Sequence, residues 1–322
     1  MASTIMDVQF STLMDLRVDY AFKLFFGTGD TSRLVSLINA VFENKGIPRV
    51  ITDLTVVNPS LEKQKDDDKL SVLDIRASLP DGSSILIEMH LYQLPEFKYK
   101  SVRSWARAYG ESLVSGNKYT LQKPVICISF LNGAIDDVHG QPIEKIHSLF
   151  HLMERDDHQV LLSDAEFHFI NMSKFVKALI GEWDTIDANT VDKFTRWLAL
   201  ITEKEIADKD ILKQLCEKED EMMSAVTELA RLSTDAVRRQ EYQRRLDELY
   251  SYNLLLEGIK EAEQRADTAE QQAEVEKQRA DTAEQQAEAE KQRADTAELA
   301  AKEQQKRIAE LEELLKKLQQ SD

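Results

Sequence analysis

Two acidic residues stand inside segments of the chain that otherwise read as buried strands. Asp74 lies in "KLSVLDIRASL" (69–79) and Glu88 lies in "SSILIEMHL" (83–91). An ionised carboxylate is costly in such a place unless a cation or hydrogen-bond donors offset the lost hydration. Two carboxylates that lie side by side can bind a divalent metal, because Mg²⁺ takes one or two carboxylates together with water and phosphate oxygens.

The turn between these segments determines whether the two carboxylates meet. The sequence "PDG" (80–82) suits a three-residue hairpin loop, with glycine at the left-handed position. The resulting register pairs Ile75 with Ile87 on an apolar face and sets Asp74 opposite Glu88 on the other face. Directly opposed residues have Cβ atoms about 4.5–5.5 Å apart. The spacing therefore predicts a carboxylate pair.

Two interpretations of this pair remain open. In the first, a metal ion lies between the carboxylates, and His90, on the same face as Glu88, adds a third polar group. In the second, Arg76, which shares that face, bridges the two acids as a structural ion pair. Spacing alone does not decide between them.

The first 175 residues predict a mixed α/β core. Helices are expected at 11–27, 31–46 and 97–116, because apolar residues recur there at spacings of three and four and glycine follows. Strands are expected at 49–58, 69–79, 83–91 and 123–131, with further strands at 144–154 and 165–172. The segment 123–131 is an unbroken apolar run, as in a strand covered on both faces.

The second half of the chain is predicted to be helical. Residues 176–258 have helical periodicity that ends at Gly258. Repeats of 14 residues, two heptads each, begin at Gln264, Gln278 and Gln292, and this period is typical of a coiled coil. The seam is made of alanines from Ala266 to Ala301, interrupted by Glu276 and Glu290, and then of Ile308, Leu311, Leu315 and Leu318.

We therefore divide the chain into three parts: a mixed α/β domain (1–175), a helical region (176–260) and a coiled coil (261–322). The coiled coil predicts a homo-oligomer; a solitary charged helix is the alternative. The chain has two cysteines, and no stretch approaches the roughly 18 apolar residues that span a membrane. We expect no membrane association and a cytoplasmic protein. The net charge of −17 argues against a nucleic-acid partner, but residues 96–123 are locally basic.

The predicted core resembles the PD-(D/E)xK nuclease superfamily, and within it the Rpn-like recombination-promoting nucleases and putative transposases. The resemblance covers about residues 10–260. It rests on "DYAFKLFFG" (19–27), "SVLDIRA" (71–77), "IEMH" (87–90), "YGESLVSGNKY" (109–119), "PVICISFL" (124–131) and the helical segment 244–264. It implies a restriction-endonuclease-like α/β fold and a metal-dependent DNA endonuclease, that is, a hydrolase linked to mobile elements.

The resemblance also implies roles for particular residues. Asp74 and Glu88 would hold Mg²⁺ or Mn²⁺, and Asp19 matches an acidic position that can complete the site. His90 stands where the superfamily usually has lysine and this family usually has glutamine. The alternative function is a catalytically degenerate nuclease fold that binds DNA or protein and acts through its coiled coil.

The helix after the hairpin carries the candidate DNA contacts. Lys98, Lys100, Arg103 and Arg107 follow the carboxylates along the chain and are suited to hold phosphates. Individually, each of these residues also fits a solvated surface cation. The expected partners are thus DNA and a second copy of the chain.

Overall fold

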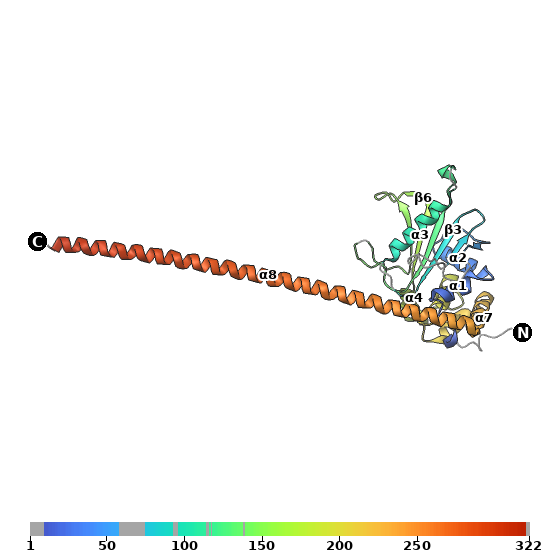
Figure 1. The fold of residues 1–322 in the computed structure, drawn as a ribbon. Coiled ribbons are helices and arrows are strands. Elements are labelled where there is room, and N and C mark those ends of the chain that lie inside the picture. The colour runs from blue at the N-terminus through green and yellow to red at the C-terminus, as the bar shows by residue number, and fades with distance from the viewer. Residues whose placement is uncertain are drawn as a thin grey trace. The chain divides into compact units, whose positions relative to one another are not determined.

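The structure is a computed structural model that describes residues 10–57, 75–92, 96–113, 116, 118–137 and 139–319, the last six without their side chains. The chain separates into two compact units, Met1–Tyr250 and Ser251–Asp322. The first unit contains a sheet with helices (Figure 1). The second is the continuation of one long helix.

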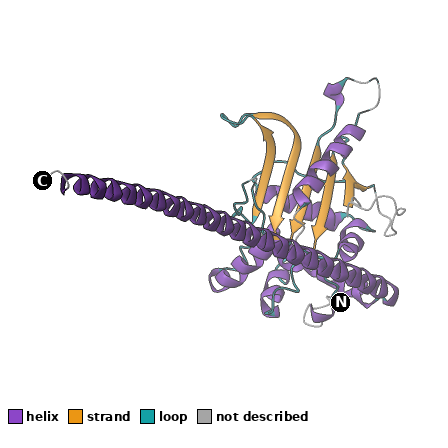
Figure 2. Ribbon diagram, turned by 60° about the vertical axis from the view of Figure 1, so that its left-hand side comes forward, coloured by secondary structure: helices purple, strands orange, loops and turns teal. Residues whose placement is uncertain are grey.

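The first unit is organised around a six-stranded mixed sheet in the order β1-β2-β3-β4-β6-β5, whose strands lie side by side in Figure 2. The strands are β1 Thr55–Val56, β2 Ile75–Ser78, β3 Ser84–His90, β4 Val125–Leu131, β5 His147–Met153 and β6 Val160–Asn171. The pairs β3–β4 and β4–β6 are parallel, and the other pairs are antiparallel. All of β4 is buried, as its unbroken apolar sequence predicts.

The β2–β3 hairpin has the register predicted from the sequence. Ile75 pairs with Ile87, and Ser78 pairs with Ser84 at the other end of the ladder. The turn closes with a 2.9 Å hydrogen bond from the Gly82 amide to the Leu79 carbonyl, and Gly82 has a φ of 88°. Only glycine adopts this left-handed backbone without strain, which is why the three-residue loop forms here.

Eight α-helices accompany the sheet in the described part of the chain. They are α1 Asp19–Gly27, α2 Ser32–Asn44, α3 Phe97–Glu111, α4 Met172–Glu182, α5 Lys193–Ile201, α6 Lys209–Cys216, α7 Asp220–Thr234 and α8 Ala236–Gln319. Short 3₁₀ turns occur at Phe10–Thr12, Tyr119–Leu121 and Trp183–Thr185. No helix among the described residues has a stretch that is both long and apolar enough to cross a bilayer.

The two faces of the sheet pack against different sets of helices. One face, which includes Ile87 and Ile128, joins α1, α2 and α4 to α7 in the larger apolar core. The other face, which includes Leu86 and Cys127, packs mainly against α3 in a smaller core. Side chains alternate between the faces of a strand, so the residues of β3 that point away from the larger core face α3.

Side-chain contacts explain why two of the predicted elements are shorter than expected. The helix expected at 11–27 begins at Asp19, because Asp15 accepts hydrogen bonds from the backbone and guanidinium of Arg17 and so competes with helical pairing. The strand expected at 49–58 is reduced to β1 in its described part. There the side chain of Asn39 bonds both the amide and the carbonyl of Ile51.

The predicted helix end at Gly258 is wrong, because α8 continues without interruption from Ala236 to Gln319. An interior glycine costs a helix about 1 kcal/mol relative to alanine. Good helix formers on either side of Gly258 offset this cost. No proline occurs in this segment to force a break.

Candidate active site

Glu88 and His90 lie at the carboxyl-terminal end of β3, on the face of the sheet that α3 covers. Leu86 precedes them on the same face and belongs to the smaller core. Glu88 is only 3% exposed and His90 only 5%. The strand thus buries a carboxylate and an imidazole next to each other, as its sequence pattern predicts.

The Glu88 carboxylate has polar partners from both β3 and α3. The His90 Nε2 atom lies 3.2 Å from Glu88 Oε2, and the Lys100 ammonium lies 3.3 Å from the same oxygen. The Ser104 hydroxyl donates to Glu88 Oε1 at 3.3 Å. These contacts replace part of the hydration that the carboxylate loses on burial.

The pKa of Glu88 reflects two opposing effects. Burial raises it, because a charged form is disfavoured away from water. The hydrogen bond with His90 and the positive charge of Lys100 lower it, and together they place the pKa below its ordinary value of 4.5. Glu88 is therefore an anion at neutral pH and can hold a cation or accept a proton.

The partners on α3 follow from its helical spacing. Lys100 and Ser104 are four residues apart and so lie on one face of the helix, toward Glu88. Ser101, on the same buried side, has its hydroxyl 3.1 Å from that of Ser129 on β4. Small serines at the contact let the helix backbone approach the sheet, which brings the longer Lys100 within reach of Glu88.

Asp74, the other carboxylate of the predicted pair, lies outside the described residues, so its position opposite Glu88 stays a prediction. Among the residues that are described, no cluster of three or more histidine, cysteine, aspartate or glutamate side chains could hold a metal ion. Arg76, the alternative partner for the acids, has its guanidinium 2.9 Å from Glu111 on α3.

Asp19 is the first residue of α1, and Arg245 of α8 binds its carboxylate through two guanidinium nitrogens. One turn later, the Phe22 ring lies 5.8 Å from the ring of Phe130 near the carboxyl end of β4. The structure therefore gives Asp19 a structural ion pair and shows no contact between it and Glu88. A catalytic role for Asp19 remains a proposal.

The predicted DNA contacts on α3 have different surroundings. The Lys98 ammonium donates to the carbonyl oxygens of Asp136 and Asp137 at 2.7 and 3.4 Å. The Arg107 guanidinium lies 3.0 Å from Glu111 Oε1, and Arg103 is exposed to solvent. Lys100 differs from these three residues, because its ammonium contacts the buried carboxylate.

Two features of this site were missed by the sequence analysis. The contact of Lys100 with Glu88 was not predicted, and its assignment to phosphate binding stays a prediction. Ser104 was not singled out, although it donates to the same carboxylate. The four-residue spacing of Lys100 and Ser104 was the available signal, since it places both on one helix face. The angle at which α3 crosses the sheet depends on core packing and could not be read from the sequence.

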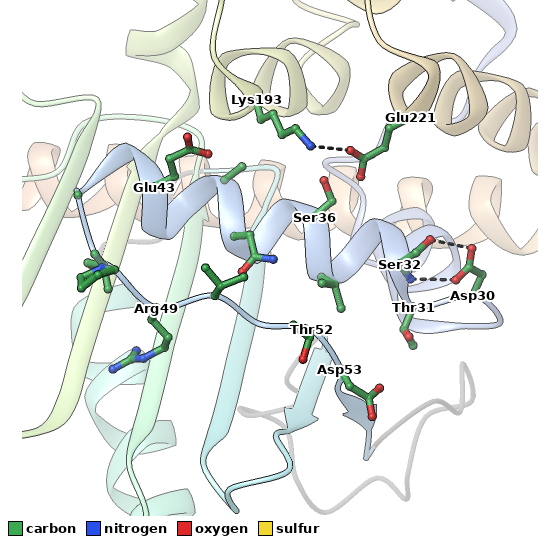
Figure 3. A pocket seen from close by; sticks show the side chains of 17 residues that line it. Asp30, Thr31, Ser32, Ser36, Glu43, Arg49, Thr52, Asp53, Lys193 and Glu221 are labelled. Carbon is green, nitrogen blue, oxygen red and sulfur yellow. Dashed lines mark hydrogen bonds and ion pairs between the residues drawn. The ribbon is translucent and has the colours of Figure 1, made fainter.

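A separate hollow of about 870 Å³ lies between α2, the segment 46–53 and the neighbouring helices, and none of the predicted site residues lines it (Figure 3). Both basic side chains of its lining have acidic partners. Lys193 lies 3.1 Å from Glu221, and Arg49 forms a bidentate pair with Glu166. Because these groups already neutralise one another, the candidate active site remains at Glu88.

A mixed sheet with parallel central strands, helices on both faces and an acidic residue at the end of a hairpin strand has the architecture of PD-(D/E)xK nucleases. The chain matches the PD-(D/E)XK nuclease family transposases over residues 16–258 and belongs to that family. The match includes the sheet, α1 to α7 and the first part of α8. No curated protein and no solved structure matches the chain.

Proposed function

We propose that the protein is a metal-dependent DNA endonuclease, which hydrolyses phosphodiester bonds at the end of β3. The observation that carries this proposal is the buried, ionised Glu88, which shares its site with His90 and Lys100 in a chain of the nuclease family. Structural ion pairs also bury carboxylates, so the proposal needs a test of activity. The nuclease class itself follows from family membership.

The metal site is proposed at Glu88 and Asp74, with Mg²⁺ or Mn²⁺ as the ion. Glu88 fits this role because it is anionic at neutral pH and lies near the end of a buried strand. A divalent ion held there would polarise the scissile phosphate and lower the pKa of a bound water. Asp19 is the proposed additional acid, available only if its carboxylate leaves Arg245.

The residues of this chain have separate proposed tasks around the phosphate. Lys100 and Ser104 orient the Glu88 carboxylate. The positive charge of Lys100 also stabilises the negative charge that develops on a phosphate undergoing attack. His90 orients the attacking water or stabilises the leaving group, according to its protonation state. Lys98, Arg103 and Arg107 hold the DNA backbone.

The long helix supports a further proposal, that the chain self-associates through residues 251–322. These residues form a compact unit separate from the sheet, and their heptad repeat is typical of helices that pair. We also propose a cytoplasmic location, which agrees with the two free and buried cysteines.

The test of the proposed activity is cleavage of supercoiled plasmid by the purified full-length chain. We expect nicked or linear DNA with Mg²⁺ or Mn²⁺ and intact plasmid in excess EDTA, with activity restored when Mg²⁺ is added back. Binding of DNA without cleavage under all of these conditions would contradict the enzyme and support the degenerate, binding-only alternative.

His90→Gln is expected to retain or raise cleavage, because glutamine is the residue usual in the family at this position. Its amide can replace the imidazole as a hydrogen-bond partner of the Glu88 carboxylate, which His90 contacts at 3.2 Å. Initial rates of plasmid nicking measure the effect. Complete loss of cleavage in a folded variant would show that the imidazole has a role that an amide cannot perform.

A further inference from the structure

The second unit carries a stripe of exposed apolar residues that no part of the described chain covers. Tyr252, Leu255 and Ile259 are 50%, 61% and 47% exposed, and Ile308 and Leu311 near the other end are 56% and 55% exposed. These residues fall on the same heptad positions, a and d, as the alanines between them. The seam therefore begins at Tyr252, two heptads earlier than the repeats, and just after the first unit ends.

We propose that residues 252–312 of two copies of this chain pair as a parallel, in-register, two-stranded coiled coil. The inference rests on the proposed self-association and adds the partner's orientation and register. Large apolar residues near both ends supply most of the buried surface, and the alanines between them let the helices approach closely.

Charges beside the seam select the parallel arrangement. Position g of the repeat carries arginine at 265, 279, 293 and 307, and position e carries glutamate at 270, 284, 298 and 312. In a parallel pair, each g residue faces the e residue five positions later on the partner helix. Each of these arginines therefore meets a glutamate of the second copy.

The antiparallel alternative matches the apolar ends but opposes like charges. The register that sets Ile259 opposite Leu311 also sets Arg265 opposite Arg307 and Arg279 opposite Arg293. Glutamates at position e face one another in the same way. Repulsion between closely placed like charges destabilises this register relative to the parallel one.

Glu276 and Glu290 occupy position d, where a parallel pair places identical residues in one layer. Each is followed by a lysine at position e, Lys277 and Lys291. A d side chain packs beside the e residue of the partner helix, so each glutamate meets a lysine of the second copy. These contacts between glutamate and lysine therefore offset the repulsion between the two glutamates in each of these layers.

Parallel pairing also determines the end of the coil at which the two copies of the first unit are attached. The first unit ends at Tyr250 and the seam begins at Tyr252, so both copies of the first unit are attached to the same end of the coil. An assembly with two candidate active sites at one end suits cleavage of two DNA strands.

Cysteine cross-linking in the full chain tests the orientation. Ala273→Cys places a thiol at position a, next to its own counterpart in a parallel pair, whereas Gln278→Cys places one at the outward position f. We expect A273C to form a disulfide-linked dimer at least tenfold faster than Q278C. The wild-type chain controls for Cys127 and Cys216, which are both buried.

The antiparallel register places Ala273 next to Ala297 of the second copy. Cross-linking that occurs only when A273C is mixed with A297C would overturn the parallel geometry and leave self-association intact. A monomeric mass for the wild-type chain in sedimentation equilibrium at tens of micromolar would instead overturn self-association itself.

Charge reversal provides an independent test. A variant with the four g-position arginines changed to glutamate should dimerise at least tenfold more weakly, because the four Arg–Glu contacts between positions g and e become repulsive. A second variant, with the four e-position glutamates changed to lysine, should be weakened as well, and mixing the two should restore a dimer. Unchanged dimerisation of the arginine variant would overturn the proposed pairing.

Discussion

Glu88→Gln is expected to reduce metal-dependent plasmid nicking by about a thousandfold while the fold is retained. The amide has nearly the same shape as the carboxylate and can still accept the hydrogen bond from Ser104. It lacks the negative charge that holds a divalent ion, and a bound metal contributes several kcal/mol of transition-state stabilisation. Because 1.36 kcal/mol corresponds to a tenfold change in rate, about three orders of magnitude follow.

A matched control is available on the same side of the sheet. Glu111 is also a carboxylate paired with cations, but its partners are Arg76 and Arg107 and its side chain is 45% exposed. Glu111→Gln should change the nicking rate by less than threefold. If Glu88→Gln cleaves as fast as the wild type in Mg²⁺ while both variants are folded, Glu88 is not the metal-binding carboxylate.

The free energies of unfolding of the wild type and of Glu88→Gln give a test that does not require activity. The folded-state pKa of Glu88 is below its ordinary value of 4.5, so ionised Glu88 contributes stability above that value. This contribution is lost as the pH falls through the folded-state pKa. We expect the difference in free energy of unfolding between the wild type and Glu88→Gln to be present at pH 7 and to shrink as the pH falls below about 4.5. A difference that does not change with pH would mean that the Glu88 charge does not contribute to stability.

The hairpin could be predicted from the sequence because local chemistry determines it. Proline and glycine in the turn select one register, and alternation then assigns Ile87 to the larger core and Glu88 to the face toward α3. The helical state of the C-terminal segment was predictable for a similar reason, since helical periodicity is a property of neighbouring residues. Both features depend on contacts that are close along the chain.

Contacts between distant segments determine the features that the sequence did not predict. Asn39 satisfies the backbone of Ile51 from a different element, which leaves no ladder for a long strand there. Likewise, Lys100 reaches Glu88 because α3 packs on the sheet at a particular angle. A lysine in a basic helix has the same local sequence whether it faces DNA or a buried carboxylate, so periodicity could not distinguish the two.

The position of Lys100 next to Glu88 predicts a large effect of its substitution on the nicking rate. The resemblance to the superfamily implies a lysine at the position of His90, and here the Lys100 ammonium reaches Glu88 Oε2 from the helix at 3.3 Å. Lys100→Met should therefore lower the turnover rate of nicking by about a hundredfold or more, within the range attributed to one electrostatic stabiliser. Lys100→Arg should recover part of the loss, because it restores the charge with a different geometry.

Lys98→Met is the matched control, since Lys98 is on the same helix but donates to the carbonyl oxygens of Asp136 and Asp137. It should weaken DNA binding, more so at low salt, and leave the turnover rate within threefold of the wild type.

The Lys100→Met and Lys98→Met variants also differ in their pH dependence. Without the Lys100 charge, the pKa of Glu88 rises toward its ordinary value, so the acid limb of the pH–rate profile moves to higher pH in Lys100→Met alone. If instead both variants lose affinity and neither shifts the profile, Lys100 is a phosphate-binding residue like Lys98.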